Sequence, residues 1–239
     1  EGLMTERPFR SPHHTVSANA LTGGGRKVRP GEISLATGGI LFLDELPEFS
    51  KNALEVLRQP MEEGRVVISR TDGTYEFPAE FQLVAAMNPC KCGYYPDRSK
   101  CHCLPGEVAK YVKRISRPLL DRIDICVEIP RVEYRDLTSE EENESSAKMR
   151  KRVEQARQIQ EKRYEKAGWK FNSRLGTAAI REFCPLGTDE QKLMELAFER
   201  MNLSARGYHR VIKVARTIAD LAGEETIREP HLLEALGYR

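Results

Sequence analysis

The chain has 239 residues, 40% hydrophobic and 31% charged, which is typical of a globular protein with one or two domains. Lys and Arg number 38 against 36 Asp and Glu, so the net charge of +2 excludes a strongly basic DNA-coating protein and an acidic tail protein. The apolar runs are too short to span a bilayer, and no signal peptide is recognisable. The expected compartment is therefore the reducing cytosol, where clustered cysteines indicate a metal site more than disulfides.

Residues 1–132 are rich in Gly and Pro, and their pattern predicts strands alternating with helices. The apolar run Ile40–Leu43 predicts a strand buried on both faces of a parallel sheet. Ser50 predicts the N-cap of a following helix. Val66–Arg70 and Thr74–Phe77, joined by a short turn with glycine, predict a β-hairpin. Three further elements are expected in this region: a buried strand at Phe81–Ala86, a helix at Val108–Ile115 and a third apolar strand at Ile123–Ile129.

The second half of the chain has a different composition. Residues 133–144 hold six acids against one Arg, which predicts a solvated linker. Residues 145–239 are predicted to be almost wholly helical. Helices are expected at about 145–167, from Thr188, from Ser204 to Leu221 with a stop at Gly223, and near Pro230. The expected fold class is therefore α/β followed by an all-α domain.

The strongest chemical signal is a pair of adjacent carboxylates, Asp44 and Glu45, at the end of the predicted strand Ile40–Leu43. Ligands bind at the carboxyl ends of strands in open α/β sheets. One carboxylate can hold the Mg²⁺ of a nucleotide, and the next can polarise a water that attacks the γ-phosphate. Taken alone, the pair could equally end a strand and cap a turn.

The surrounding residues carry a wider resemblance. The stretch PFRSPHHT and the stretch RPGEISLATGGILFLDELPEF resemble the magnesium-chelatase-related AAA+ ATPases, most of all the ComM/YifB type. The resemblance covers nearly the whole chain. It implies a partial P-loop NTPase core of the AAA+ class at 1–132 and a helical lid domain at 145–239, with Asp44 binding Mg²⁺ and Glu45 acting as the catalytic base.

The resemblance assigns the other ATPase residues in chain order. Asn88 corresponds to sensor 1, although Asn-Pro alone commonly forms a turn. Arg122 corresponds to an arginine finger from the neighbouring subunit, with a local Arg–Asp surface pair as the alternative. Arg117 stands where relatives usually have Gly and is a second candidate finger. The sensor 2 arginine maps to Arg206, with Arg210 one helical turn further as the alternative.

No P-loop motif G-x-x-x-x-G-K-[ST] and no Gly-Lys dipeptide occur in the sequence. The resemblance implies that the P-loop precedes Glu1, so we expect these 239 residues alone to bind ATP weakly and not to hydrolyse it. It further implies a homo-oligomeric, hexameric ring in the cytoplasm that couples ATP hydrolysis to DNA remodelling of the helicase type, such as branch migration.

Four of the six cysteines fall within fourteen residues: Cys90, Cys92, Cys101 and Cys103. Four thiolates could bind Zn²⁺ tetrahedrally, and His102 could replace one of them. Free thiols on a loop and disulfides are the alternatives. Relatives of the ComM/YifB type carry a similar cysteine-rich insert after sensor 1.

The predicted hairpin has Arg65 and Arg70 near its ends, and in the related AAA+ clade a hairpin before sensor 1 lines the pore and touches DNA. The segment Lys91–Arg122 carries eight bases against three acids, which suits single-stranded or branched DNA and equally a solvated surface. For the adjacent His13 and His14, a structural or phosphate-proximal role is favoured over a metal site, because neighbouring side chains usually point in different directions.

Two other functional classes stay open. One is the ATPase subunit of a magnesium chelatase, which drives Mg²⁺ insertion into a porphyrin; the cysteine-rich insert argues against it, because the pigment enzymes generally lack one. The other is a non-enzymatic DNA-binding module. The combination of Asp44, Glu45, Asn88 and Arg122 argues against that class, because binding alone would not require it.

Overall fold

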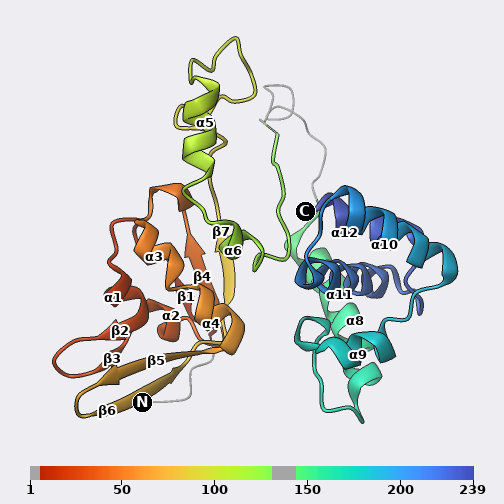
Figure 1. Ribbon diagram of the computed structural model, residues 1–239. Coiled ribbons are helices and arrows are strands. Elements are labelled where there is room, and N and C mark those ends of the chain that lie inside the picture. Colours follow the sequence, from red (N-terminus) through yellow and green to blue (C-terminus); the bar gives the residue numbers. More distant parts are fainter. Residues whose placement is uncertain (1–5, 131–143) are drawn as a thin grey trace. The chain divides into compact units, whose positions relative to one another are not determined.

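The computed structural model describes residues 6–130 and 144–239, and the chain divides into two units, Glu1–Ile123 and Asp124–Arg239 (Figure 1). The predicted acidic linker at 133–144 lies outside the described residues, except for Glu144. Within the described ranges, no helix combines the length and the apolar character needed to cross a bilayer.

The first unit is built on a parallel sheet of three strands in the order β1-β4-β7. The strands are β1 (Phe9–Arg10), β4 (Ile40–Leu43) and β7 (Gln82–Ala85). Phe9 lies opposite Ile40 and Ile40 lies opposite Gln82, so the strands begin level and their carboxyl ends share one edge. A second, antiparallel pair joins β2 (Gly23–Gly24) to β3 (Arg29–Pro30).

The central strand β4 is buried on one face. Leu41 and Leu43 are 0% exposed, whereas Ile40 and Phe42 are only half-buried. The buried pair belongs to a core that includes side chains from the short helices of this unit. These helices are α1 (Ala18–Thr22), α2 (Glu32–Leu35), α3 (Lys51–Glu55), α4 (Arg58–Glu63) and α6 (Arg117–Leu120). The prediction of burial on both faces is therefore wrong for the described residues, because the helices pack on the side of Leu41 and Leu43.

The strand β7 also differs from the prediction of a buried strand. Gln82, Val84 and Ala85 are exposed. The reason is its position at the edge of the described sheet, where β4 is its only neighbouring strand. An apolar run of this length does not by itself distinguish an edge strand from a central one.

The predicted hairpin is confirmed, and the helix predicted at Val108–Ile115 is present but begins and ends three residues earlier. β5 (Arg65–Arg70) and β6 (Gly73–Pro78) pair in antiparallel register, with Arg70 opposite Gly73. The helix α5 (Pro105–Val112) follows the cysteine-rich loop. The hairpin and α5 lie at opposite ends of the first unit (Figure 1).

The predicted third strand at Ile123–Ile129 is wrong, because this segment forms no strand. Ile125, Val127 and Ile129 are exposed. The backbone N–H of Cys126 donates instead to the carbonyl of Tyr238 at 2.9 Å, within the second unit. An apolar run becomes a strand only where another strand supplies a ladder of hydrogen bonds, and none of the described strands pairs with it.

The second unit is helical, and α11 contacts α8, α9, α12 and η2. Its elements are α8 (Ser146–Tyr164), η2 (Asn172–Arg174), α9 (Thr177–Phe183), α10 (Thr188–Arg200), α11 (Ala205–Ala222) and α12 (Glu229–Gly237). The predicted start at Thr188 is confirmed. The predicted caps of α11 are confirmed too: Ser204 Oγ accepts from the N–H of Gly207 at 3.0 Å, and Gly223 adopts φ 75°.

A charged network around Asp220 lies inside the second unit, where this carboxylate is fully buried. It accepts hydrogen bonds from Asn172 Nδ2 at 2.8 Å, Arg163 Nη1 at 3.0 Å and Arg216 Nε at 3.1 Å. The hydroxyl of Tyr164 donates to Asn172 Oδ1 at 2.6 Å. One carboxylate therefore joins α8, η2 and α11, and its partners compensate for its desolvation.

Ser204→Ala is expected to lower the free energy of unfolding of the second unit by about 1 kcal/mol, because the N–H of Gly207 loses its capping oxygen. The chain has a single tryptophan, Trp169, which lies in this unit, so its fluorescence during urea unfolding reports on it. The exposed Ser146, inside α8, provides a control: Ser146→Ala should change stability by less than about 0.5 kcal/mol. Equal unfolding midpoints for wild type and Ser204→Ala would show that the cap contributes nothing.

Candidate ATPase site and cysteine cluster

Three of the predicted ATPase side chains follow neighbouring strands at the carboxyl edge of the parallel sheet. Asp44 and Glu45 come directly after β4, and Asn88 comes shortly after β7. The pairing extends beyond β7, because the N–H of Ala86 donates to the carbonyl of Leu43 at 2.9 Å. The chain that leads to Asn88 is therefore held beside the chain that carries the two carboxylates.

Glu45 has a left-handed backbone, with φ 52° and ψ 45°, which is uncommon for a residue other than glycine. Its N–H donates to Asp44 Oδ1 at 2.8 Å, and its carbonyl accepts from the N–H of Glu48 at 2.7 Å. The second bond belongs to the short helix η1 (Leu46–Glu48). The side chain of Glu45 is 54% exposed and Asp44 is exposed as well, so both carboxylates are accessible at the sheet edge.

The contact of His14 with Glu45 was not predicted. His14 Nδ1 lies 3.0 Å from Glu45 Oε2. The ring of His14 packs edge-on against Phe49, with 6.4 Å between centroids, and lies 4.1 Å from the ring of His13. The available signal was the position of the His-His pair a few residues after β1. Because β1 runs parallel to β4, this segment emerges at the same edge as Glu45.

An ion pair joins the end of α5 to the segment that follows Glu45. Arg114, just after this helix, forms an ion pair with Glu48, with 3.0 Å between Nη1 and Oε2. Tyr111 of α5 is buried, and its pKa is raised by that burial and then by the charges of Glu48, Cys90 and Glu45. These effects indicate that α5, the cysteine loop and the carboxylates are close neighbours.

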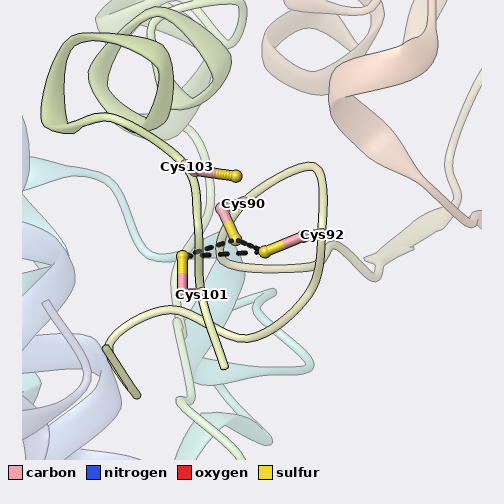
Figure 2. Close-up of side chains that lie close together, drawn as sticks. All are labelled: Cys90, Cys92, Cys101 and Cys103. Atoms are coloured by element: carbon pink, nitrogen blue, oxygen red, sulfur yellow. Dashed lines mark hydrogen bonds between the residues drawn. The ribbon is translucent and has the colours of Figure 1, made fainter. Parts of the chain in front are cut away.

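The four predicted cysteines come together in the loop between β7 and α5 (Figure 2). The sulfur of Cys90 lies 3.3 Å from that of Cys92 and 3.8 Å from that of Cys101, and Cys92 and Cys101 are 3.6 Å apart. With Cys103 included, all four sulfurs lie within 4.8 Å of one another. All are free thiols, so the disulfide alternative does not hold in this structure.

Hydrogen bonding favours the thiolate form of Cys90. Burial acts to raise the pKa of this thiol, but hydrogen bonds from the Tyr95 N–H and the Cys92 thiol lower it, to about 6 overall. The thiolate is the form of cysteine that binds metals. His102, the alternative ligand, is exposed and is not among the side chains whose ligand atoms come together.

Arg122, the predicted arginine finger, is nearly buried inside the first unit. Its side chain is only 9% exposed and forms an ion pair with Glu62 of α4 rather than with a neighbouring Asp. Its Nη1 donates to the carbonyl of Pro118 at 2.6 Å. Arg117, the second candidate, is exposed at the start of α6 and is the more accessible of the two.

The two candidate sensor 2 arginines lie in the first half of α11, in the second unit. Arg206 is exposed. Arg210 is 14% exposed, and its Nε lies 3.4 Å from Asp124 Oδ1. Arg206 is therefore the more accessible of the pair.

The hairpin arginines differ in their partners. Arg65 lies between two carboxylates, with Nη1 3.0 Å from Glu76 Oε2 and Nε 3.4 Å from Glu63 Oε2. Arg70 is exposed at the end of β5. The charge of Arg65 is thus compensated by one carboxylate of the hairpin and one of α4, so Arg70 is the stronger candidate for an anionic partner.

Comparison with known proteins extends the resemblance over both units. The family model "Magnesium chelatase, subunit ChlI" matches residues 1–137, and "Magnesium chelatase, subunit ChlI C-terminal" matches residues 143–239. Competence protein ComM of Haemophilus influenzae is 48% identical over 98% of this chain and 45% of its own length. Protein YifB of Escherichia coli is 45% identical over 98% of this chain and 46% of its own length. The magnesium-chelatase 38 kDa subunit of Acidiphilium rubrum is 24% identical over 89% of this chain and 55% of its own length.

The chain spans about half the length of the curated relatives it matches. Its first unit has the parallel sheet and helices of a partial AAA+ core, and its second unit is an all-α lid. The chain belongs to the magnesium chelatase ChlI family of AAA+ ATPases.

Proposed function

We propose that this chain supplies the hydrolysing part of a ring-forming AAA+ ATPase that remodels DNA. The observation that carries the proposal is the common edge of β4 and β7, where Asp44 and Glu45 emerge next to the segment that leads to Asn88. In a protein of the relatives' full length, the P-loop comes from outside these 239 residues, so the 239-residue chain alone should bind ATP weakly and not turn it over.

Three residues of one subunit are proposed to act on the attacking water and the nucleotide. The exposed carboxylate of Asp44 suits Mg²⁺, a hard cation that takes oxygen ligands and offsets the charge of the phosphates. Glu45 orients the water and accepts its proton. The amide of Asn88 holds the same water without competing for that proton.

The neighbouring subunit is proposed to complete the site with an arginine, which stabilises the charge on the transferring phosphoryl group. Arg122 is the first candidate and must leave Glu62 to reach a neighbour, whereas Arg117 is already exposed. Arg206, or Arg210, would report the nucleotide state to the lid. The proposed assembly is a homo-hexameric ring in the cytoplasm. The proposed cofactors are ATP, Mg²⁺ and a structural Zn²⁺ on the four cysteines.

DNA remodelling, such as branch migration, is the proposed work of the ring. One support is the 48% identity to a relative named as a competence protein, against 24% and 25% to magnesium-chelatase subunits, so the chelatase alternative has weaker support. The other is the hairpin β5–β6, where Arg70 is exposed.

Forked DNA is expected to stimulate the ATPase of the full-length protein, and Arg70→Ala is expected to weaken DNA binding. The affinity falls as salt rises, and the loss of one phosphate contact should make the slope of log affinity against log salt concentration less steep by about 1. Fluorescence anisotropy of labelled forked DNA over a salt series measures this slope. Arg200→Ala, at the exposed end of α10, is the control and should leave the slope unchanged.

An ATPase rate that is the same with and without forked DNA would exclude the remodelling function, because an enzyme that remodels DNA couples ATP hydrolysis to its DNA substrate. Equal salt slopes for wild type and Arg70→Ala would remove the hairpin from the proposed DNA interface while leaving the ATPase assignment in place.

A further inference from the structure

The loop between β7 and α5 has no hydrophobic core of its own. Among residues 90–103, only Cys90 and Cys101 are buried, while Tyr94 and Tyr95 are exposed. A segment this short cannot be held in one conformation by apolar burial, and small units without a core usually rely on a metal or on disulfides. The two buried side chains of this loop are the thiols of Cys90 and Cys101, and the sulfurs of Cys92 and Cys103 lie beside them.

The backbone of the loop is turned so that the sulfurs converge. The N–H of Gly93 donates to the carbonyl of Cys90 at 3.0 Å, and Gly93 has φ 76°, which favours glycine. Two further bonds follow: the N–H of Asp97 donates to the carbonyl of Tyr94 at 2.9 Å, and the N–H of Cys101 donates to the carbonyl of Asp97 at 2.8 Å. Figure 2 shows three sulfurs joined by dashed lines, with Cys103 alongside.

The sulfur spacing fits a tetrahedral metal site. A Zn–S bond of about 2.3 Å gives about 3.8 Å between sulfurs at the corners of a tetrahedron. The three distances among Cys90, Cys92 and Cys101 are 3.3, 3.6 and 3.8 Å, and Cys103 lies within 4.8 Å of the others. Four sulfurs without a carboxylate select zinc rather than Mg²⁺ or Ca²⁺. The N–H of Tyr95, 3.5 Å from Cys90 Sγ, supplies the outer hydrogen bond typical of such sites.

The cluster adjoins Asn88. Cys90 follows two residues later in the chain, and a side chain on Gly93 would begin 3.9 Å from Asn88 Cγ. On the other side, Ala86 is held by its hydrogen bond to the carbonyl of Leu43 in β4. The chain is therefore held on both sides of Asn88, by the hydrogen bond of Ala86 to β4 and by the membership of Cys90 in the cysteine cluster.

We propose that the four cysteines bind one structural Zn²⁺ and that this ion fixes the position of Asn88. Binding forms four Zn–S bonds, and each thiol that is protonated gives its proton to solvent. Asn88 does not contact the ion and is positioned by it through Cys90 and Gly93. The zinc site is argued from the cluster alone, whereas the consequence for hydrolysis rests on the ATPase function proposed above.

The chain itself, produced in zinc-supplemented medium, is expected to contain about one zinc per molecule by ICP mass spectrometry. Co²⁺ in its place should give the visible absorption of a tetrahedral thiolate site. Cys90→Ser and Cys101→Ser should lose the metal, whereas Cys126→Ser, which removes an exposed cysteine outside the cluster, should keep it. A wild-type chain without metal, one loaded with iron instead, or zinc retained by Cys90→Ser would each overturn the site.

The effect of the ion on the position of Asn88 is tested by hydrogen exchange of the wild-type chain before and after a chelator removes zinc. The use of the wild-type chain avoids variants that fail to fold. The amides of Ala86 and Gly93, which are hydrogen-bonded on either side of Asn88, are expected to exchange about tenfold faster without zinc and to regain protection when zinc is restored, while α11 in the second unit stays unchanged. Unchanged exchange at Ala86 and Gly93 would overturn the positioning role and leave the zinc site standing.

In the full-length protein, zinc removal is expected to lower kcat for ATP about tenfold with little change in KM. Asn88→Ala should lower kcat by itself, and zinc removal should then lower it no further. If zinc removal lowered the kcat of the Asn88→Ala variant by a further tenfold, the ion would not act on hydrolysis by positioning Asn88. Absence of any ATPase in the zinc-loaded protein would refute the proposed ATPase function, whereas the exchange result on the chain would still decide the positioning.

Discussion

Glu45→Gln is expected to lower kcat for ATP hydrolysis by the full-length protein by about 10²- to 10⁴-fold, while ATP still binds. Glutamine keeps the size and the exposed position of the side chain at the sheet edge, but its amide cannot accept a proton from the attacking water. A coupled ATPase assay measures kcat, and equilibrium binding of a fluorescent ATP analogue measures retention of the nucleotide.

Glu182→Gln is the matched control, because it makes the same substitution at an exposed position on α9, in the other unit. It should leave kcat within about twofold of wild type, as surface substitutions away from a site usually do. Wild-type turnover in Glu45→Gln would contradict the assignment of Glu45 as the base. Loss of ATP binding in that variant would point to a defect in the nucleotide site rather than in proton transfer.

Asp220→Ala is expected to destabilise the second unit by about 3–5 kcal/mol. Asp220 is fully buried, and its removal leaves the guanidinium groups of Arg163 and Arg216 without the carboxylate that compensates for their burial. Urea unfolding followed by the fluorescence of Trp169 measures the loss, because that tryptophan lies in the same unit.

The matched control is Asp189→Ala, which breaks an exposed ion pair with Lys192 at 3.1 Å. Exposed pairs contribute about 0–1 kcal/mol, so the unfolding midpoint should barely move. Equal losses for Asp220→Ala and Asp189→Ala would show that the buried network does not hold the second unit together.

Local signals predicted much of this fold. The caps at Ser50, Ser204 and Gly223 lie where the sequence places them, because a cap depends on hydrogen bonds within a few residues. The hairpin β5–β6 follows from alternation and a glycine turn. The position of the carboxylate pair at the carboxyl edge of the sheet also followed from the sequence, because the pair directly ends the predicted strand Ile40–Leu43.

Contacts between distant segments could not be predicted. The pairing of His14 with Glu45 and of Arg122 with Glu62 depends on the path of the chain in space, which spacing does not encode. The segment Ile123–Ile129 has the composition of a strand, but strand formation depends on a partner and not on composition alone. The burial of β4 on one face could not be predicted for a similar reason: a uniformly apolar run does not show which face of the strand the helices cover.

The ATPase rate of mixed oligomers is the most direct measurement of a shared catalytic site. The full-length Glu45→Gln variant is mixed with Arg122→Ala and, in a second series, with Arg117→Ala. The arginine variant that is inactive by itself identifies the finger. If Glu45 of one subunit and an arginine of the next complete one site, random mixing in equal amounts leaves about a quarter of the interfaces intact, and about a quarter of wild-type activity should return for the true finger. Mixtures no more active than the separate variants, in both series, would contradict a shared site.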